Sequence, residues 1–299
     1  MKLGIIVPQG WTGEYDGWEA GRAWSRTIAV AGQAERLGAE SIWLFDHYHT
    51  VPRPTDELTF ESFTALSALA ALTHRVRLGH IVICNGFRNP ALVAKMAGTL
   101  DVISSGRFEL GMGAGWKREE WQAYGYGFPE TRERLAMLSD ALEVVTRMLA
   151  EGTERAAYEG EHARVRGAIN LPRGLQSPRI PIMVGGNGPN VTWRLAARHA
   201  DELNLDGLST TELREALPVI RSRCEEIGRD PDSLRVSLHA WWGDDDWRTS
   251  GDRRIAYLAE LRDLGLSRVI GLLQASATDD GVLEALAEDA RAAGVELAS

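Results

Sequence analysis

The sequence predicts an α/β fold, a single (β/α)8 TIM barrel, and three observations support this prediction. The chain of 299 residues alternates short apolar runs with longer segments of helical periodicity, and it contains eight such pairs. The connections between them are short, so that successive strands have to pair in parallel. An open sheet of this size would need protected edge strands, and the sequence has no signals for them. A closed barrel therefore follows.

The first half of the chain supplies four of these pairs. Residues 3–7 form a continuous apolar run that is too short for a helix, which is typical of a fully buried strand. Gly38 ends the first helical pattern and Pro90 begins the third. The other strands are expected at residues 41–45, 76–83 and 108–112, and the helices at residues up to 37, 60–74, 90–104 and 129–151.

Residues 152–174 break the alternation. This segment is rich in Gly, Arg and Glu and has a hairpin signal around residues 158–162. We expect an insertion between strands 4 and 5 that covers one face, within one domain spanning residues 1–299. The alternation then resumes with strands 180–184, 202–205, 234–239 and 267–270, and with helices 189–199, 210–227, 252–264 and 279–293.

Composition limits the class of protein. With 44% hydrophobic residues, the chain can bury a large core. It has no run of about 18 apolar residues and Met1 leads directly into a strand, so we expect neither a membrane-spanning nor a secreted protein. Cys84 and Cys224 match no disulfide or zinc spacing, which fits a reducing cytoplasm. The net charge of −9 argues against nucleic acid and anionic membranes as partners.

The stretch from Arg107 to Trp116 combines a buried strand with a run of glycines. Gly113, Ala114 and Gly115 follow the strand directly. Because glycines place no side chain above the strand end, a flat ring or a phosphate could come close to the backbone there. A tight turn that binds nothing has the same pattern. The GxGxG spacing in mid-chain is not the dinucleotide-binding fingerprint.

In a TIM barrel the catalytic groups lie at the carboxyl ends of the strands. Asp46 and His47 follow the second strand, and His47 and His49 have the His-x-His spacing of zinc hydrolases. The later strand ends lack the further ligands that a zinc site needs, so we expect no metal. Two interpretations remain: a structural hydrogen bond between Asp46 and His47, or an acid–base histidine oriented by its neighbour.

A second glycine run lies between the fifth strand and the helix that Pro189 is expected to begin. It comprises Gly185, Gly186, Asn187 and Gly188. The backbone N–H groups of such a loop could hold an anion together with the helix dipole. An ordinary glycine loop is the alternative interpretation.

Aromatic side chains are expected to form the walls of the site. Ten tryptophans is a high count for this length, and several lie in loops. Trp242 could either pack inside the protein or form part of the pocket wall, and the sequence does not decide between these two roles. Cys84 is interpreted as a buried apolar residue and not as a nucleophile, because no base is spaced to activate it. The predicted pocket residues are Trp11, Trp116, His239 and Trp241.

Five segments together resemble the bacterial luciferase-like monooxygenase superfamily, in its branch of deazaflavin-dependent oxidoreductases. They comprise residues 41–47, 77–90 with 94–96, 100–116, 181–188 and 198–204. The motifs include Trp-Leu-Phe-Asp-His at residues 43–47 and Gly-Met-Gly-Ala-Gly-Trp at residues 111–116. The resemblance covers residues 3 to about 208, and it is the combination that is specific.

The resemblance implies a (β/α)8 barrel with an insertion and a flavin-type ring lying across the barrel mouth. By position, Asp46 and His47 flank the ring. His47 is the expected acid–base group, because histidine is the side-chain type whose unperturbed pKa lies near neutrality. The family often has a cis peptide at this strand end, so the peptide between Ile81 and Val82 is expected to be cis. The other implied cofactor contacts are Ile81, Val82 and Cys84 behind the ring, Gly113, Ala114 and Gly115 along it, and Gly185, Gly186, Asn187 and Gly188 at its phosphate.

The implied function is that of an oxidoreductase moving a hydride between coenzyme F420 and a small organic substrate. Some relatives place a carboxylate directly after the glycine run, where this chain has Trp116. This departure argues against a sugar phosphate and favours an apolar or aromatic substrate. The alternatives are an FMNH2-dependent monooxygenase on the same scaffold, a non-catalytic flavin-binding protein and, more distantly, a metal-dependent hydrolase. A cytoplasmic homodimer is expected.

Overall fold

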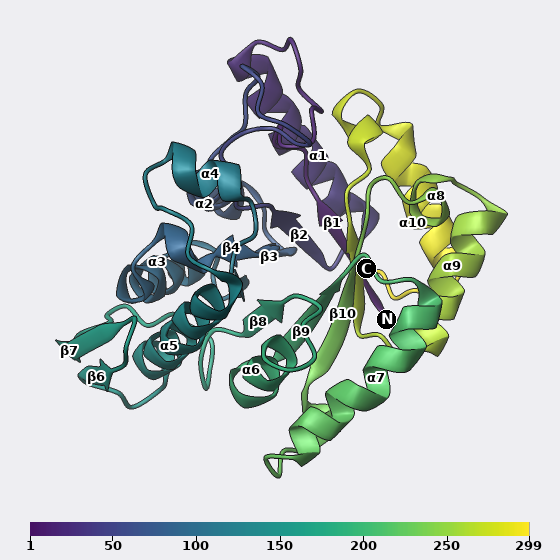
Figure 1. Ribbon diagram of the computed structural model, residues 1–299. Coiled ribbons are helices and arrows are strands. Elements are labelled where there is room, and N and C mark those ends of the chain that lie inside the picture. The colour runs from purple at the N-terminus through teal and green to yellow at the C-terminus, as the bar shows by residue number, and fades with distance from the viewer. Residues whose placement is uncertain (299) are drawn as a thin grey trace.

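The computed structural model describes residues 1–298, and it confirms the predicted closed barrel (Figure 1). Within these residues eight parallel strands follow one another around the ring, and the last pairs with the first. In spatial order they are β1 (Lys2–Ile6), β2 (Ser41–Leu44), β3 (Arg77–His80), β5 (Phe108–Gly113), β8 (Ile182–Gly185), β9 (Glu202–Asp206), β10 (Arg235–Ala240) and β11 (Arg268–Gly271).

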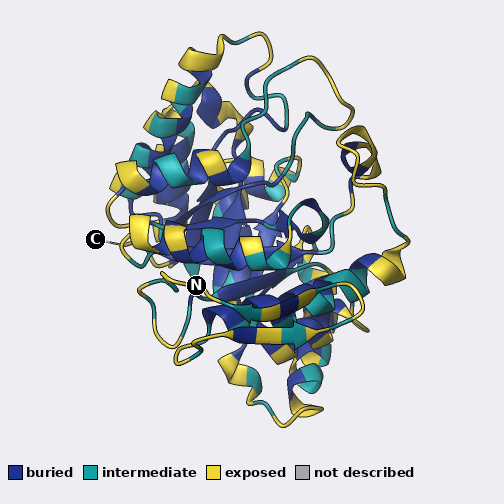
Figure 2. Cartoon of the chain, turned by 90° about the vertical axis from the view of Figure 1, so that its left-hand side faces the viewer, coloured by how far each residue is buried: buried dark blue, intermediate teal, exposed yellow. Residues whose placement is uncertain are grey.

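Helices form the outer layer around the strands, and their outward faces are the exposed surface (Figure 2). Helix α1 ends at Gly38, which has a positive φ of 90°, as the sequence predicts. None of the described helices is long and apolar enough to cross a membrane. The long helices are α1 (Ala20–Leu37), α2 (Ser62–Leu72), α3 (Pro90–Ile103), α5 (Thr131–Leu149), α6 (Thr192–His199), α7 (Thr210–Glu225), α9 (Asp252–Asp263) and α10 (Gly281–Ala292).

The structure differs from the sequence prediction at three places. The strand expected at residues 76–83 is divided into β3 and β4 (Ile83–Cys84), and the Ile81–Val82 peptide between them is cis, as expected. The helix expected from Pro189 begins only at Thr192, because residues 189–191 form a turn first. The short helix α8 (Asp245–Arg248) was not predicted. Further short elements are α4 (Arg118–Ala123), η1 (Asn85–Phe87), η2 (Pro231–Ser233) and η3 (Gln274–Ala277).

The segment expected as an insertion contains the predicted hairpin. Strands β6 (Ala156–Glu159) and β7 (Arg164–Ala168) pair antiparallel and lie beside α5, outside the barrel (Figure 1). The hydroxyl of Tyr158 donates to Asp140 on α5 at 2.7 Å, which fixes the hairpin to that helix. The assignment of residues 1–299 to one domain stays a prediction.

The barrel interior is apolar in its middle. Trp43 on β2 is fully buried, and its ring occupies the space above Gly4 and Gly79 on the two neighbouring strands. A Cβ atom at either glycine would collide with this ring, so these positions require glycine. Ile6, Phe45 and Met183 complete this packing. The indole therefore fills the centre of the barrel, between its two ends.

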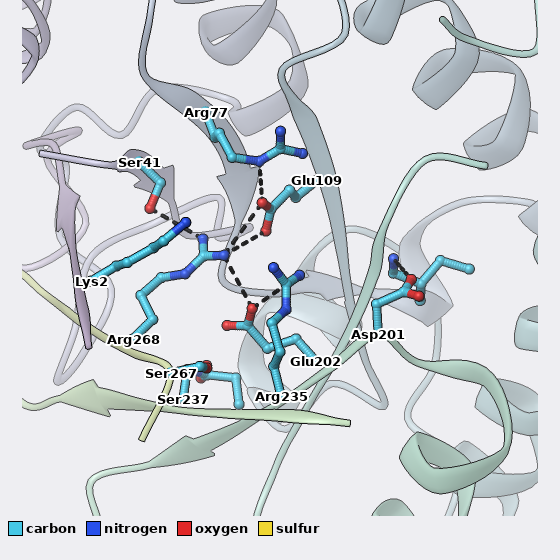
Figure 3. Close-up of polar contacts among 12 residues, drawn as sticks. Lys2, Ser41, Arg77, Glu109, Asp201, Glu202, Arg235, Ser237, Ser267 and Arg268 are labelled. Atoms are coloured by element: carbon cyan, nitrogen blue, oxygen red, sulfur yellow. Dashed lines mark hydrogen bonds and ion pairs between the residues drawn. The ribbon is translucent and has the colours of Figure 1, made fainter. Parts of the chain in front are cut away.

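Charged side chains close the amino-terminal end of the barrel (Figure 3). Arg268 is 1% exposed and lies 3.1 Å from both Glu109 and Glu202. Burial raises the pKa of Glu202, whereas at Glu109 the charges of Arg268 and Arg77 outweigh burial and lower the pKa. Because paired charges fill the amino-terminal end of the barrel, a ligand site can form only at the other end, where the carboxyl ends of the strands lie.

Candidate active site

A cavity of about 850 Å³ opens at the carboxyl ends of the strands. Its walls are mostly apolar and aromatic, with a few polar groups, as in binding sites for small molecules. Its lining residues come from the ends of the eight barrel strands and from the segments that follow them. The candidate residues from both halves of the sequence therefore meet in one place.

His47 lies in this cavity and is held on two sides. Its Nδ1 atom is 2.7 Å from Oε2 of Glu120, and its ring stacks on that of Trp11 with centroids 4.1 Å apart and planes 2° apart. Nε2 has no partner among residues 1–298 and is left for a ligand. The carboxylate partner of His47 is thus Glu120 on α4, and not the neighbouring Asp46 that the sequence suggested.

Glu120 is fully buried and ties helix α4 to the loop after β2. Its Oε1 accepts backbone N–H groups of Tyr48 at 3.0 Å and His49 at 3.4 Å. Because Oε1 is occupied by these donors, Oε2 is the atom that faces His47, and an accepting Oε2 places the proton on Nδ1. Sequence analysis missed Glu120, since it stands beside the exposed Glu119 in a charged run that looks like a solvated helix face.

Asp46 is buried beside the cavity and has a different set of contacts. Its two oxygens accept from Arg88 at 2.7 and 2.9 Å, from Ser62 at 2.7 Å and from the backbone N–H of Cys84 at 2.8 Å. Burial alone would raise the pKa of this carboxyl, but the Arg88 guanidinium outweighs it and holds that pKa below its usual value. Asp46 therefore fixes the segment after β3 as a carboxylate, without touching His47.

Glycines of both runs make room for protein side chains at the cavity floor. A Cβ atom at Gly113 would lie 2.6 Å from Cγ2 of Val82, and one at Gly185 would lie 2.9 Å from Cγ1 of the same residue. A Cβ at Gly115 would collide with Sγ of Cys84. Val82 and the strand ends thus form a smooth floor, to which Ile81 and Ala114 also contribute.

Cys84 behaves as a buried apolar residue. Its side chain is 7% exposed, and burial raises the pKa of the thiol to about 12. A thiol with this pKa is protonated near neutrality and is a poor nucleophile. Among residues 1–298, no three His, Cys, Asp or Glu side chains converge as metal ligands would.

The second glycine run leaves backbone donors free at the edge of the cavity. The N–H of Gly186 donates to the carbonyl of Asn204 at 3.0 Å, but those of Asn187 and Gly188 have no partner within residues 1–298. Helix α6 begins just beyond, at Thr192, with no side chain capping it. Of the run, Gly185 and Gly186 line the cavity, while Asn187 and Gly188 lie past its edge. Two free N–H groups before an uncapped helix suit an anion.

Trp11, Trp116 and Trp241, which the sequence analysis assigns to the pocket, line the cavity. Trp116 is 61% exposed and Trp241 46% exposed although both line the cavity, so their rings are available to a ligand. Trp242, which sequence analysis left undecided, stacks on Trp241 with centroids 5.0 Å apart and meets Trp11 edge-on at 5.3 Å. Phe45 packs against both Trp11 and Trp242.

His239 also has a carboxylate partner but is less accessible than His47. Its Nδ1 lies 2.8 Å from Oδ1 of Asp206, which also accepts from Nε1 of Trp241 at 2.9 Å. Burial would raise the pKa of Asp206, but these two hydrogen bonds outweigh it and lower that pKa. Nε2 of His239 is buried and unpartnered, next to the ring of Phe45. His239 is therefore part of the wall.

Known proteins resemble this chain in sequence. The family model described as luciferase-like monooxygenase matches residues 1–246. The F420-dependent glucose-6-phosphate dehydrogenase of Kineococcus radiotolerans is 36% identical over 202 residues, which are 67% of this chain and 58% of that relative. An uncharacterized protein of Mycobacterium tuberculosis is 28% identical over 271 residues, 84% of this chain and 88% of that protein. The match therefore spans less than two thirds of the length of the dehydrogenase.

Solved structures resemble it in fold. An F420-dependent secondary alcohol dehydrogenase in complex with an F420-acetone adduct has a TM-score of 0.80 at 19% identity, over 98% of both chains. The coenzyme F420 dependent tetrahydromethanopterin reductase of Methanopyrus kandleri has a TM-score of 0.74 at 20% identity, over 96% of this chain and 97% of the reductase. These likenesses establish a shared barrel fold.

Proposed function

Because the chain belongs to the luciferase-like monooxygenase family, we propose that it is an oxidoreductase that uses coenzyme F420 to move a hydride to or from a small organic substrate. The observation that carries this proposal is His47, held by Glu120 with Nε2 free, beside a glycine-lined floor. Relatives named as F420-dependent dehydrogenases support the choice of cofactor. They do not favour the alternative of an FMN-dependent monooxygenase.

The residues at the barrel mouth fit a flat ring with a phosphate-bearing tail. Val82 and the two glycines facing it offer a floor from which no long side chain projects. The free N–H groups of Asn187 and Gly188, before the uncapped end of α6, suit the phosphate. Both features lie on adjacent strand ends, β5 and β8, so one ligand can reach both.

In the proposed reaction the chain handles the proton. Hydride transfer is the chemistry that a bound F420 would supply. His47, with its proton on Nδ1, has a lone pair on Nε2 that can accept the proton of a substrate hydroxyl. The imidazolium that results faces the carboxylate of Glu120, which stabilises it at 2.7 Å. In the opposite direction Nε2 returns this proton to the oxygen of a carbonyl substrate.

The cavity walls favour an apolar or aromatic substrate. Trp11, Trp116 and Trp241 offer ring faces, and Lys117 is the one lysine or arginine among the described lining residues. A sugar phosphate, the substrate in the name of several relatives, carries two negative charges that one ammonium does not balance. We therefore propose that the substrate is not a sugar phosphate.

The experiment that tests this function is a titration of the purified protein with F420 and with FMN, followed by fluorescence. We expect F420 to bind at least about tenfold more tightly, a difference of about 1.4 kcal/mol. Absorbance of the deazaflavin should then report turnover of alcohols or carbonyl compounds. Equal or tighter binding of FMN would refute the proposed cofactor. Binding of F420 with no turnover of any such compound would favour a non-catalytic flavin-binding protein.

The cellular setting is also part of the proposal. Cys84 and Cys224 are both free and buried, which fits a reducing cytoplasm. A homodimer is proposed from the family resemblance, and size-exclusion chromatography with light scattering would test it. A monomer at all concentrations would remove the dimer and leave the active-site proposal intact.

A further inference from the structure

Lys117 is a buried cation without a counter-ion. It directly follows Trp116 after the first glycine run, lines the cavity and is only 6% exposed. No carboxylate of residues 1–298 lies within 4 Å of its Nζ atom. The three carboxylates of the cavity, Asp46, Glu120 and Asp206, are each bonded to an arginine or a histidine instead. Lys117 therefore differs from every other charged group that faces this cavity.

The ammonium group of Lys117 has spare hydrogen-bonding capacity. Nζ donates to the backbone carbonyl of Pro52 at 3.1 Å and lies 5.4 Å from the ring centroid of Trp116. An ammonium carries three N–H donors, and the carbonyl of Pro52 takes one of them. Both neighbours of Nζ, Pro52 and Trp116, line the cavity. The remaining donors are therefore available at its edge.

A buried charge of this kind calls for an anion. Removing an ammonium from water is costly unless an opposite charge compensates it. A carbonyl and an aromatic ring provide only part of this compensation. If Lys117 served only to hold Pro52, a neutral donor would do so without that cost. A ligand anion in the cavity would provide the missing charge.

We propose that Lys117 binds a carboxylate of the substrate, so that the substrate combines an apolar or aromatic body with one acidic group. A carboxylate on Nζ would place this body against Trp116, whose ring meets that of His47 edge-on at 5.8 Å. The reacting carbon would then lie near Nε2 of His47. This inference rests on the proposed function only in taking the cavity as the substrate site.

The geometry points to the substrate and not to the cofactor as the source of the anion. The proposed phosphate donors follow β8, whereas Nζ of Lys117 bonds to Pro52 in the loop after β2, three strands away around the ring. That loop also carries His47. Lys117 therefore lies on the same side of the cavity as His47, the proposed acid–base group, and as Trp11 and Trp116.

The test compares benzoate with benzamide, which have the same ring and nearly the same shape but differ in charge. Binding is measured from quenching of the cavity tryptophans, with and without F420. A charge-assisted hydrogen bond predicts that benzoate binds wild-type protein about 10- to 100-fold more tightly than benzamide. Raising the salt concentration should reduce this preference. Equal binding of the two probes to wild-type protein would overturn the proposal.

Four variants locate the preference. Lys117→Met and Lys117→Gln remove the charge, and Gln keeps a donor for the carbonyl of Pro52, so both should lose the preference for benzoate. Lys117→Arg should retain it. Lys95→Met is the matched control, because Lys95 also donates to a backbone carbonyl, that of Leu171, but lies outside the cavity. A preference that survives in both neutral variants would place the anion elsewhere and overturn the proposal.

The cofactor is tested separately. F420 affinity should be the same in wild-type protein and in Lys117→Gln. If Lys117→Gln instead weakened F420 and left benzoate binding unchanged, Lys117 would serve the cofactor and the proposal would be wrong. Because benzoate binding is measured without F420 as well, failure of the proposed F420 chemistry would not be mistaken for failure of the Lys117 proposal.

Discussion

Replacing Glu120 with Gln should reverse the tautomer of His47. In the structure Oε1 of Glu120 accepts the N–H of Tyr48 at 3.0 Å and Oε2 faces Nδ1 of His47 at 2.7 Å. Gln keeps an oxygen for the backbone donor and puts an NH2 group opposite Nδ1. Two donors cannot face each other, so Nδ1 becomes the acceptor and the proton moves to Nε2. His47 then presents a donor where the reaction needs an acceptor.

The size of the effect follows from the bonds that are kept and lost. The loop keeps its backbone hydrogen bonds, and the charge-assisted bond to His47 is exchanged for a neutral one, so the free energy of unfolding should fall by only about 1 kcal/mol. Oxidation of an alcohol depends on acceptance of its proton at Nε2, and loss of this help lowers the rate by about 10²–10⁴-fold. F420 affinity should not change, because Glu120 faces His47 and not the glycine run.

Two measurements check this prediction. Nitrogen-15 NMR of labelled histidine distinguishes the tautomers directly, and kcat is measured with an alcohol that the wild-type protein oxidises. Glu119→Gln is the matched control, since Glu119 is the exposed neighbour on the same helix and should leave both readouts unchanged. If Glu120→Gln kept the proton on Nδ1 and the wild-type kcat, the carboxylate would not orient His47.

Three further predictions follow from the same geometry. His47→Asn should keep F420 affinity and lower kcat by about 10²–10⁴-fold, with no comparable loss for His239→Asn; losses in the opposite order would make His47 only part of the wall. Gly186→Val should weaken F420 by about tenfold, because φ at this position is 131° and a branched side chain is strained there; unchanged affinity in a folded variant would place the phosphate elsewhere. Burial lowers the pKa of His80 from 6.5 to about 4 despite the opposing charge of Asp46, so His80 contributes stability that is present above pH 6.5 and is lost as pH falls toward 4. The loss amounts to about 3 kcal/mol. The free energy of unfolding of His80→Leu, measured by chemical denaturation at both ends of this pH range, should therefore change less than that of the wild-type protein. An equal change in the two proteins would contradict the lowered pKa of His80.

The barrel could be predicted because its signals are local. Buried parallel strands appear as short apolar runs, as at residues 41–45, and helix ends carry their own markers, such as Gly38. The interruption between His80 and Ile83 could not be read from apolar character, because every residue there is apolar enough for a strand. The start of α6 was misplaced for a similar reason, since Pro189 suits a turn as well as a first helical residue.

The candidate site was predictable only where residues occupy strand ends. His47 and the glycine runs were found in this way, because the barrel fixes where strand ends meet. Glu120 and Lys117 lie just beyond a strand end, and their inward direction depends on how α4 folds back over the loop after β2. Adjacent charged residues in sequence give no indication of which one is buried. Tertiary packing, and not local pattern, therefore decides these two roles.

The glycines show how one pattern can serve two purposes at once. Gly113 and Gly185 were expected to leave space for a ligand, and the space directly above them is occupied by Val82, whose methyl groups would lie 2.6 and 2.9 Å from added Cβ atoms. Without side chains at these two positions, Val82 can lie flat against the strand ends. An alanine at either position would push Val82 toward the cavity and raise its floor. The glycines would therefore act on the proposed ring through Val82, because they set how far its side chain projects into the cavity.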